Sequence, residues 1–491
     1  MKALANLALD TARSQGATYA DVRLIEHREE TVRVKNGVVE TLSDTTDRGF
    51  GVRVVAEGAW GFASSAVLNR DEVERIAALA VEIAHASAVT RDAPIDLGPP
   101  VTSTGSYQTP VEIDPFTIAA DEKIALLLEA DRRMRRADGV KVTRGSVVST
   151  REEKVFANTE GAFTTQTIIE TGAGIVALAV DDGEVQQRSY PNSFGRDQRT
   201  LGWEYIEDID LPGNGERVGS EAVALLSADP CPSAVTTLIL GPTQLALQIH
   251  ESCGHPTELD RVFGSEAAYA GTSFLKPDKV DTFRYGSPVV NLTADATLPG
   301  GLGTFGWDDE GVAAQRVELV KEGRFVGYLT SRETAVQLAK LKGEPVEQAR
   351  SGGAMRASGW NRIPLIRMTN VSIEPGTWDL DDLIADTEEG IYMETNRSWS
   401  IDDKRLNFQF GTEIGYEISD GRLGRMLKNC TYTGMTPQFW RSCDAICNEA
   451  YWQVWGTPNC GKGQPSQIAH TGHGAAPARF RDIQVGVMRS R

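Results

Sequence analysis

Hydrophobic and polar positions alternate along the first ninety residues in a way that predicts two helices around a sheet. Leu4, Leu7, Ala8 and Ala12 recur at helical spacing. The pair Asn36-Gly37 is typical of a hairpin turn between two alternating segments. The expected elements, in chain order, are a helix over 2–15, strands over 20–27, 30–35, 38–42 and 49–56, and a helix over 71–88.

The remaining pattern predicts a second mixed region and then a long stretch of strands and loops. Residues 90–115 are rich in Pro, Thr and Ser and are expected to form a linker. Expected elements are a helix over 118–137, short strands over 141–190, a helix over 216–227, a strand over 234–240, a helix from Pro242, and helices over 332–341 and near Leu380. We therefore predict an α+β fold. An N-terminal α/β domain (1–100) with an antiparallel sheet and helices and a central α+β region (112–228) precede a large, mainly-β C-terminal domain (232–491).

Composition narrows the class of protein. The 491 residues carry a formal net charge of −18, which argues against a nucleic-acid-binding surface, because phosphate binding needs clustered Lys and Arg. The sequence has no apolar run of membrane length, and its first residues are typical of a short amphipathic helix rather than a signal peptide. Six cysteines without regular spacing favour a reducing compartment. We expect a cytoplasmic protein with no membrane partner.

The segment Gln248-Ile249-His250-Glu251-Ser252-Cys253-Gly254-His255 holds the most specific chemistry in the chain. His followed by Glu is typical of zinc hydrolases, in which the imidazole binds the metal and the carboxylate is the general base. The second histidine follows at i+5 rather than i+4, so a regular helix would rotate it roughly 140° away. Gly254 and Pro256 offer a solution, because both favour ending the helix. We expect the helix to end near Gly254 and His255 to fold back from an unwound turn.

A catalytic zinc ion usually has three protein ligands, and the short motif supplies two. A hydrogen-bonded core histidine is the alternative reading of His250. The remaining candidates for a third ligand are Cys253, Cys430, Cys443, Cys447, Cys460, His470 and His473. Cys443 and Cys447 could bind a metal as an i, i+4 pair on a helix, and His470 to His473 is best read as a surface or interface loop. Cys460 lies between Gly and Pro residues that leave its thiol room to approach an ion, and Lys462 could help to hold a thiolate. These residues alone do not select one candidate.

Residues Gly301 to Gly306 match Gly-x-Gly-x-x-Gly letter for letter, but they do not predict a dinucleotide site. Such a site needs the glycine turn to open a helix. Here Pro299 precedes the turn and the acidic segment 307–311 follows it, which favours no helix and would repel a phosphate. We expect instead a flexible glycine loop near the active site.

Several further segments, taken in order, resemble the TldD/PmbA family of zinc metallopeptidases, sometimes described as modulators of DNA gyrase. They are Gly49 to Arg53 with Gly58 to Ala63, His250 to Arg261, Gly303 to Gly311, Glu394 to Ser400, Asn407 to Gly411, and Asn459 to Gln464. The resemblance spans nearly the whole chain. It implies zinc on His250, His255 and Cys460, with Glu251 as the general base. Because the family's inactive partner subunit lacks the motif, this chain is similar to the TldD side.

The resemblance also implies a substrate class and a partner. Family members hydrolyse small or unfolded peptides in a sequestered chamber at a dimer interface, so we expect a peptide substrate and a homodimer or a heterodimer with a PmbA/TldE-like paralogue. Two alternatives remain at this point. One is a non-catalytic modulator or accessory subunit, and the other is a zinc amidohydrolase that acts on a small molecule.

Overall fold

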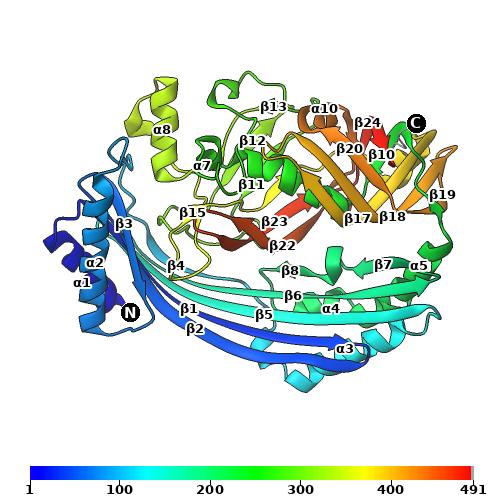
Figure 1. Cartoon of the computed structure of the whole chain (residues 1–491), viewed down its shortest axis with the longest axis horizontal. Helices are drawn as coiled ribbons and strands as arrows, with labels where there is room; N and C mark the ends of the chain where they lie inside the picture. The colour runs from blue at the N-terminus through cyan, green and yellow to red at the C-terminus, as the bar shows by residue number, and fades with distance from the viewer. Residues whose placement is uncertain (488–491) are drawn as a thin grey trace.

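The computed structural model describes residues 1–487, which form two large sheets stacked one above the other (Figure 1). The first sheet has the order β3-β2-β1-β5-β6-β4, and two short strands, β7 and β8, also pair with β6. Its strands are β1 (Tyr19–Lys35), β2 (Val38–Ala56), β3 (Ala59–Ser65), β4 (Thr104–Gln108), β5 (Val140–Asn158), β6 (Phe163–Asp181), β7 (Glu184–Tyr190) and β8 (Asp197–Arg199).

Four long antiparallel strands, β1, β2, β5 and β6, make this sheet continuous across the N-terminal and central regions. The two expected strands over 20–27 and 30–35 are one strand, β1, and those over 38–42 and 49–56 are one strand, β2. The hydrophobic alternation lapses in the middle, but the backbone ladder does not, and Arg28 pairs with Asp44 across it at 2.7 Å. Residues 90–115 are not simply a linker, because β4 pairs in parallel with β6.

Helices cover the long sheet at its two ends (Figure 1). At one end α1 (Lys2–Ser14) and α2 (Arg70–Ala88) pack on β1 to β3 over one hydrophobic core. At the other end α3 (Ala120–Met134), the short α4 (Glu204–Asp208) and α5 (Leu211–Ser227) enclose a second core. The predicted helices in this part are therefore confirmed, although α5 begins five residues earlier than expected, at a Pro in its first turn.

The C-terminal region holds the second large sheet and the largest hydrophobic core. Its strand order is β17-β10-β24-β20-β18-β19-β9, β21 pairs with β24, and β17 also pairs with β18. These strands are β9 (Asp229–Pro230), β10 (Ala234–Leu240), β17 (Glu389–Ile401), β18 (Asn407–Ser419), β19 (Arg422–Lys428), β20 (Thr431–Met435), β21 (Cys443–Ile446) and β24 (Ala478–Val485). Cys443 thus belongs to a strand, so Cys443 and Cys447 do not form the i, i+4 pair on a helix that the sequence left open.

Smaller elements complete this region. A four-stranded sheet holds β11 (Leu292–Asp295), β12 (Arg316–Lys321), β13 (Arg324–Phe325) and β16 (Val371–Ile373); β14 (Met355–Arg356) pairs with β15 (Leu365–Ile366), and β22 (Gln453–Lys462) with β23 (Gln467–Ala475). The α-helices are α6 (Pro242–Ile249), α7 (Leu259–Val262), α8 (Arg332–Lys342), α9 (Leu380–Ala385) and α10 (Thr436–Arg441). Single turns lie at η1 (Pro115–Thr117), η2 (Ser193–Gly195), η3 (His250–Gly254), η4 (His255–Thr257), η5 (Pro277–Lys279), η6 (Val346–Gln348) and η7 (Glu449–Tyr451). The predicted α+β class is confirmed.

Buried ion pairs join the long sheet to the C-terminal region through the acidic segment 307–311. Asp309 lies 2.9 Å from Lys154 and 3.5 Å from Arg23, both on the long sheet. Glu310 lies 3.4 Å from Arg53 of β2. These acids therefore have a structural role, because a buried carboxylate requires a partner.

The expected flexible glycine loop before this segment is wrong. Residues 301–305 are buried, and the Gly303 N–H donates to the Asn370 side chain at 2.8 Å. A Cβ on Gly303 would lie 2.4 Å from the Thr369 backbone, so the glycine is required by close packing rather than by motion.

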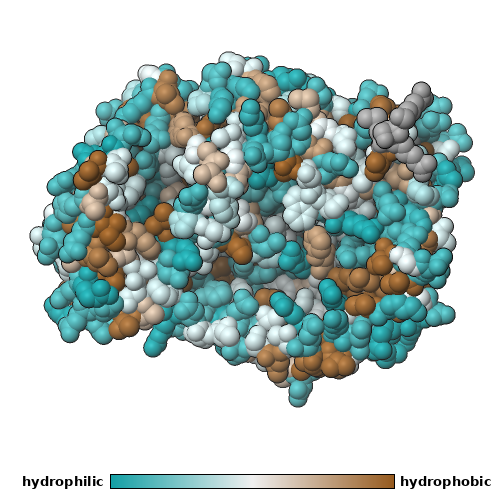
Figure 2. All heavy atoms as spheres, viewed as in Figure 1, coloured by the Kyte–Doolittle hydropathy of each residue, from teal (hydrophilic) through white to brown (hydrophobic). Residues whose placement is uncertain are grey.

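Hydrophobic side chains are mainly inside the molecule, in these three cores. On the face shown in Figure 2 they form small groups among hydrophilic ones. No helix within residues 1–487 is long and apolar enough to cross a membrane.

Candidate metal centre

His250 and His255 face one another because the helix widens between them. After α6, residues His250–Gly254 form a π turn, and the His255 N–H donates to the His250 carbonyl, which is an i+5 hydrogen bond. The two imidazole rings lie 4.9 Å apart between centroids. The i+5 spacing, which a regular helix could not use, therefore places both rings on one side.

The expected unwinding at Gly254 is wrong. His255 keeps helical dihedrals (φ −54°, ψ −42°) and begins a 3₁₀ turn that includes Pro256. Gly254 is also helical, at φ −69°. Its lack of a side chain matters for packing, since a Cβ there would lie 1.9 Å from the Met368 sulfur.

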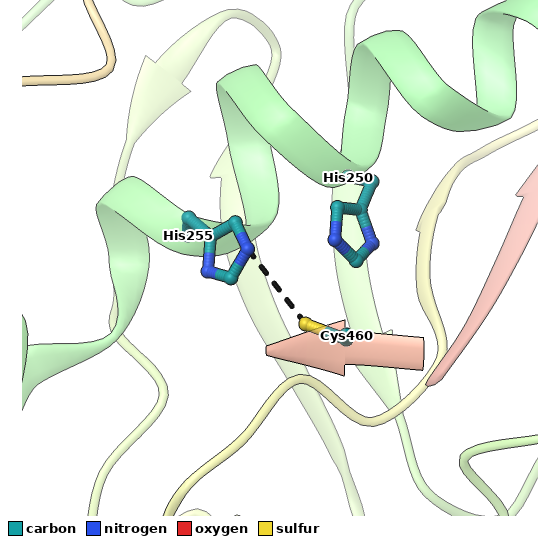
Figure 3. Close-up of side chains that lie close together, drawn as sticks. All are labelled: His250, His255 and Cys460. Atoms are coloured by element: carbon teal, nitrogen blue, oxygen red, sulfur yellow. Dashed lines mark hydrogen bonds between the residues drawn. The ribbon is translucent and has the colours of Figure 1, made fainter. Parts of the chain in front are cut away.

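Cys460 reaches the two histidines from β22 (Figure 3). Its Sγ lies 3.7 Å from His255 Nε2, and potential ligand atoms of His250, His255 and Cys460 all lie within 4.8 Å of one another. Typical Zn–N and Zn–S bonds in a tetrahedral site would separate a nitrogen and a sulfur ligand by about 3.6 Å. The three side chains therefore fit one metal ion and leave a fourth position open.

Hydrogen bonds behind the imidazoles fix which nitrogen faces this point. The His473 Nδ1–H donates to the Val371 carbonyl at 2.9 Å, so its Nε2 accepts a hydrogen bond from His250 Nδ1–H at 2.8 Å. On His255, Nδ1–H donates to Glu258 Oε2 at 2.9 Å. Both histidines thus present an Nε2 lone pair, as metal ligands must.

Burial lowers the pKa of His250, and it lowers the pKa values of His255 and His473 well below the usual value. A protonated imidazole has no lone pair to offer a metal ion. The lowered pKa values of His250 and His255 therefore favour the neutral form that can bind one.

The thiol of Cys460 is held in a setting that favours the thiolate. Burial raises its pKa, whereas pairing with a protonated His255 and the charge of the Arg367 guanidinium lower it, and the net pKa lies below the usual value. The guanidinium effect persists when His255 is neutral. Arg367 is itself buried and donates to the Cys460 carbonyl. A thiolate is the form that binds metal, so the donor set agrees with a zinc-type ion.

Lys462, which the sequence suggested as a partner of the thiolate, has a different role. Its Nζ lies 2.8 Å from Asp260 and 3.3 Å from Glu258 Oε1. Lys462 therefore holds the carboxylate that in turn orients His255.

The three candidate ligands line a cavity of about 270 Å³, and Glu251, which follows His250 in the chain, lines it too. Its Oε2 accepts a hydrogen bond from Arg405, which lies in the turn between β17 and β18. Arg405 adopts a left-handed backbone conformation (φ 61°), and its N–H donates to the Asp402 carbonyl at 2.8 Å. This strained, hydrogen-bonded turn fixes the guanidinium over Glu251.

Sequence reasoning missed the roles of four residues of this arrangement, one of which is Arg367, in the segment between β15 and β16. His473 is buried in β23, so its assignment to a surface loop is wrong, and no local pattern indicates that β23 passes beside α6. Arg405 comes from a distant turn. Glu258 could have been found, because its i+3 spacing from His255 is typical of a carboxylate that orients a helical histidine. The other candidate ligands lie elsewhere: His470 pairs with Glu170 at 2.6 Å, and Cys253, Cys430, Cys443 and Cys447 are buried outside the three-residue cluster.

Solved structures share this fold over almost the whole chain. A protein described as a modulator of a DNA gyrase from Thermotoga maritima superimposes with a TM-score of 0.76 at 17% identity, covering 99% of this chain and 100% of that one. TldE from Thermococcus kodakarensis gives a TM-score of 0.73 at 16% identity, covering 99% and 100%.

Curated relatives match at higher identity. A metalloprotease of Methanothermobacter thermautotrophicus is 29% identical over 95% of both chains. A metalloprotease of Methanocaldococcus jannaschii is 28% identical over 88% of this chain and 90% of its own. A metalloprotease TldD homologue of Haemophilus influenzae is 26% identical over 95% and 92%.

Three family models match in order: PmbA/TldA metallopeptidase domain 1 at residues 20–84, the central domain at 113–228 and the C-terminal domain at 233–486. Together they define a metallopeptidase-type protein of three regions. The chain belongs to the PmbA/TldA family, the TldD/PmbA family that the sequence resembles.

Proposed function

We propose that the chain is a zinc-dependent peptidase whose metal ligands are His250, His255 and Cys460 and whose general base is Glu251. The observation that carries this proposal is the convergence of two correctly oriented imidazoles and a thiol within 4.8 Å, beside a carboxylate in the same cavity. A structural zinc site normally has four protein ligands, whereas three with an adjacent carboxylate are typical of a catalytic one.

When bound, a zinc ion supplies Lewis acidity, since it lowers the pKa of water towards about 7 and polarises a carbonyl. The protein's own groups handle the proton. Glu251 has Oε2 engaged by Arg405, which leaves Oε1 to accept a proton from the attacking water. Glu251 then gives that proton to the nitrogen of the leaving amine, which would otherwise depart as an unstable anion.

The positioning residues keep this geometry during turnover. His473 and Glu258 hold the two imidazoles, and Arg367 holds the backbone of Cys460. Because these groups are buried and hydrogen-bonded, the site needs little reorganisation when the substrate arrives.

The substrate class and partner rest on the family. The metalloprotease names of the curated relatives support peptide hydrolysis, and the structural likeness to a TldE supports an assembly of TldD/TldE type. We propose small or unfolded peptides as substrates and either a homodimer or a pair with a PmbA/TldE-like paralogue, in the cytoplasm.

The test compares substrate classes. The purified chain, alone and with a co-expressed paralogue, is loaded with zinc and given an unstructured peptide pool and a set of acylated amines. Hydrolysis of peptides that is lost in Glu251→Gln supports the proposal. Hydrolysis of the acylated amines alone would favour a small-molecule amidohydrolase, and no hydrolysis in any combination would favour an accessory subunit.

A further inference from the structure

Arg196 brings a positive charge from the central region into the cavity of the metal centre. It lies between η2 and β8, and it lines the same cavity of about 270 Å³ as His250, Glu251 and Cys460. β8 is fixed against the β22–β23 hairpin, because the Gly456 N–H donates to Asp197 Oδ1 at 2.6 Å. The position of Arg196 relative to the metal centre is therefore set by packed backbone.

The guanidinium of Arg196 has no protein partner among residues 1–487. It forms no ion pair and no side-chain hydrogen bond there, and its Cζ lies over the Phe194 ring, 5.6 Å from the centroid. Neighbouring arginines differ: Arg199 lies 3.1 Å from Asp197, and Arg188 lies 2.8 Å from Glu221. Burial lowers the pKa of Arg196, because no nearby acid offsets the loss of water. A half-buried, unpaired charge is costly, which indicates that an anion from outside completes it.

The charges that line the cavity also favour an anion. Within the described chain, Glu251 is its one carboxylate and already pairs with Arg405, and the sulfur of Cys460, a proposed metal ligand, lies against His255. Arg196 therefore leaves an uncompensated positive charge in the cavity, although the whole protein carries −18. Such a local excess of one sign attracts a ligand of the opposite sign.

We propose that Arg196 binds the C-terminal carboxylate of the peptide substrate, so that hydrolysis occurs close to the peptide's C-terminus. The planar guanidinium can donate two parallel hydrogen bonds to a carboxylate. The C-terminal carboxylate belongs to every peptide and is attached to the backbone that carries the scissile bond. Its capture therefore sets which bond lies over the metal centre without reading side chains. This inference rests on the proposed peptidase function, and it adds that the enzyme recognises the C-terminal end of its peptide substrate.

The test measures binding separately from turnover. Zinc-loaded Glu251→Gln, with the paralogue if activity requires it, is titrated with a short fluorescent peptide and with the same peptide amidated at its C-terminus. A hydrogen bond to a charged group contributes about 1.5–3 kcal/mol, so the free acid is expected to bind about ten- to a hundredfold more tightly. Arg196→Gln, added to Glu251→Gln, should remove this preference.

Two controls define what the preference means. Arg144→Gln makes the same change of charge at an exposed position of β5 that does not line this cavity, and it should keep the preference. An amidated peptide with an internal Asp or Glu should bind like the plain amide. Equal binding of acid and amide, no measurable binding of either, or rescue by the internal acid would overturn the proposal.

Product analysis adds a second readout with the active enzyme. Mass spectrometry of early products should show loss of one or a few C-terminal residues, and Arg196→Gln should raise KM for free acids but not for amides. Internal cleavage with no dependence on the terminus would contradict the proposal. If the binding preference holds but no peptide is hydrolysed, the carboxylate site stands and the proposed peptidase function fails.

Discussion

His250 donates a hydrogen bond from Nδ1 to Nε2 of His473 at 2.8 Å, although the two residues are 223 positions apart in the chain. The His473 ring is in turn fixed by the Val371 carbonyl. This chain of contacts orients a potential metal ligand from behind. The role of His473 therefore concerns the affinity of the site rather than the chemistry of hydrolysis.

We predict that His473→Ala weakens zinc binding by about 10–100-fold, as loss of a group that orients a metal ligand typically does. The reason is that His250 loses the acceptor that fixes its tautomer. Competition with a chromophoric chelator gives the zinc Kd. His85→Ala, which changes a partly exposed histidine on α2 that does not line the cavity of the metal centre, is the control and should leave the Kd unchanged. An unchanged Kd in a folded His473→Ala protein would contradict the role.

Arg405→Gln should lower kcat by about 10–100-fold, which corresponds to the loss of a charged hydrogen bond of about 1.5–3 kcal/mol. The side chain of Glu251 would then sample orientations that do not reach the water. Zinc content should stay unchanged, because Arg405 touches no ligand. Steady-state peptide hydrolysis and metal analysis of the same samples check both expectations. Loss of zinc together with activity would show instead that Arg405 holds the ligands.

Gly456→Ala should destabilise the protein by about 1–3 kcal/mol, since a side chain there overpacks the contact between β22 and β8. Its Cβ would lie 1.9 Å from the Gln198 carbonyl. Gly461→Ala is the matched control on the same strand, because nothing lies within 4 Å of its Cβ position. Denaturant unfolding gives both free energies. Equal stability of the two variants would indicate that β8 can move away from the hairpin.

The Glu170–His470 pair predicts a pH-dependent stability. Burial raises the pKa of Glu170, but the attraction of His470 lowers it by more, so the net pKa lies below 4.5. Burial lowers the pKa of His470, but the attraction of Glu170 raises it by more, so the net pKa lies above 6.5. Because the carboxyl pKa is lowered on folding, ionised Glu170 stabilises the fold above pH 4.5, and this contribution is lost as the pH falls through the lowered pKa. Because the imidazole pKa is raised on folding, protonated His470 stabilises the fold below pH 6.5, and this contribution is lost as the pH rises through the raised pKa.

Glu170→Gln should therefore reduce the free energy of unfolding by about 1–2 kcal/mol more at pH 5.5 than at pH 9. Denaturant unfolding at both pH values, with a chelator present throughout, excludes a contribution from metal. Glu216→Gln, which removes an exposed pair with Arg136, should show little change between the two pH values. A difference that grows towards pH 9 would contradict the assignment.

Local patterns predict the long helices because each has an apolar face, and some of them begin at a capping residue. The helix α2 begins after Asn69, whose side chain accepts from the Glu72 N–H, and α8 begins with a capping box at Ser331. The long strands were divided wrongly, because their middle residues are polar and ladder hydrogen bonds do not depend on hydrophobic alternation. Pairing of β4 across a supposed linker is a nonlocal contact that no short window contains.

The metal-ligand set was only partly accessible to physical reasoning from the sequence. The motif indicated His250, Glu251 and His255, and the family resemblance, not the spacing, singled out Cys460. The π turn could not be predicted, because the packing of Gly254 against Met368 helps to decide it. His473 and Arg405 could not be predicted either, since each reaches the site from a distant strand or turn.

The most direct test of the account is the zinc content of the purified chain, measured together with peptide hydrolysis, for the wild type, Glu251→Gln and Cys460→Ser. We expect about one zinc per chain in the wild type and in Glu251→Gln. Turnover should fall by about 10²–10⁴-fold in Glu251→Gln, and most zinc should be lost from Cys460→Ser. Full zinc occupancy in Cys460→Ser, or wild-type turnover in Glu251→Gln, would contradict the proposed site.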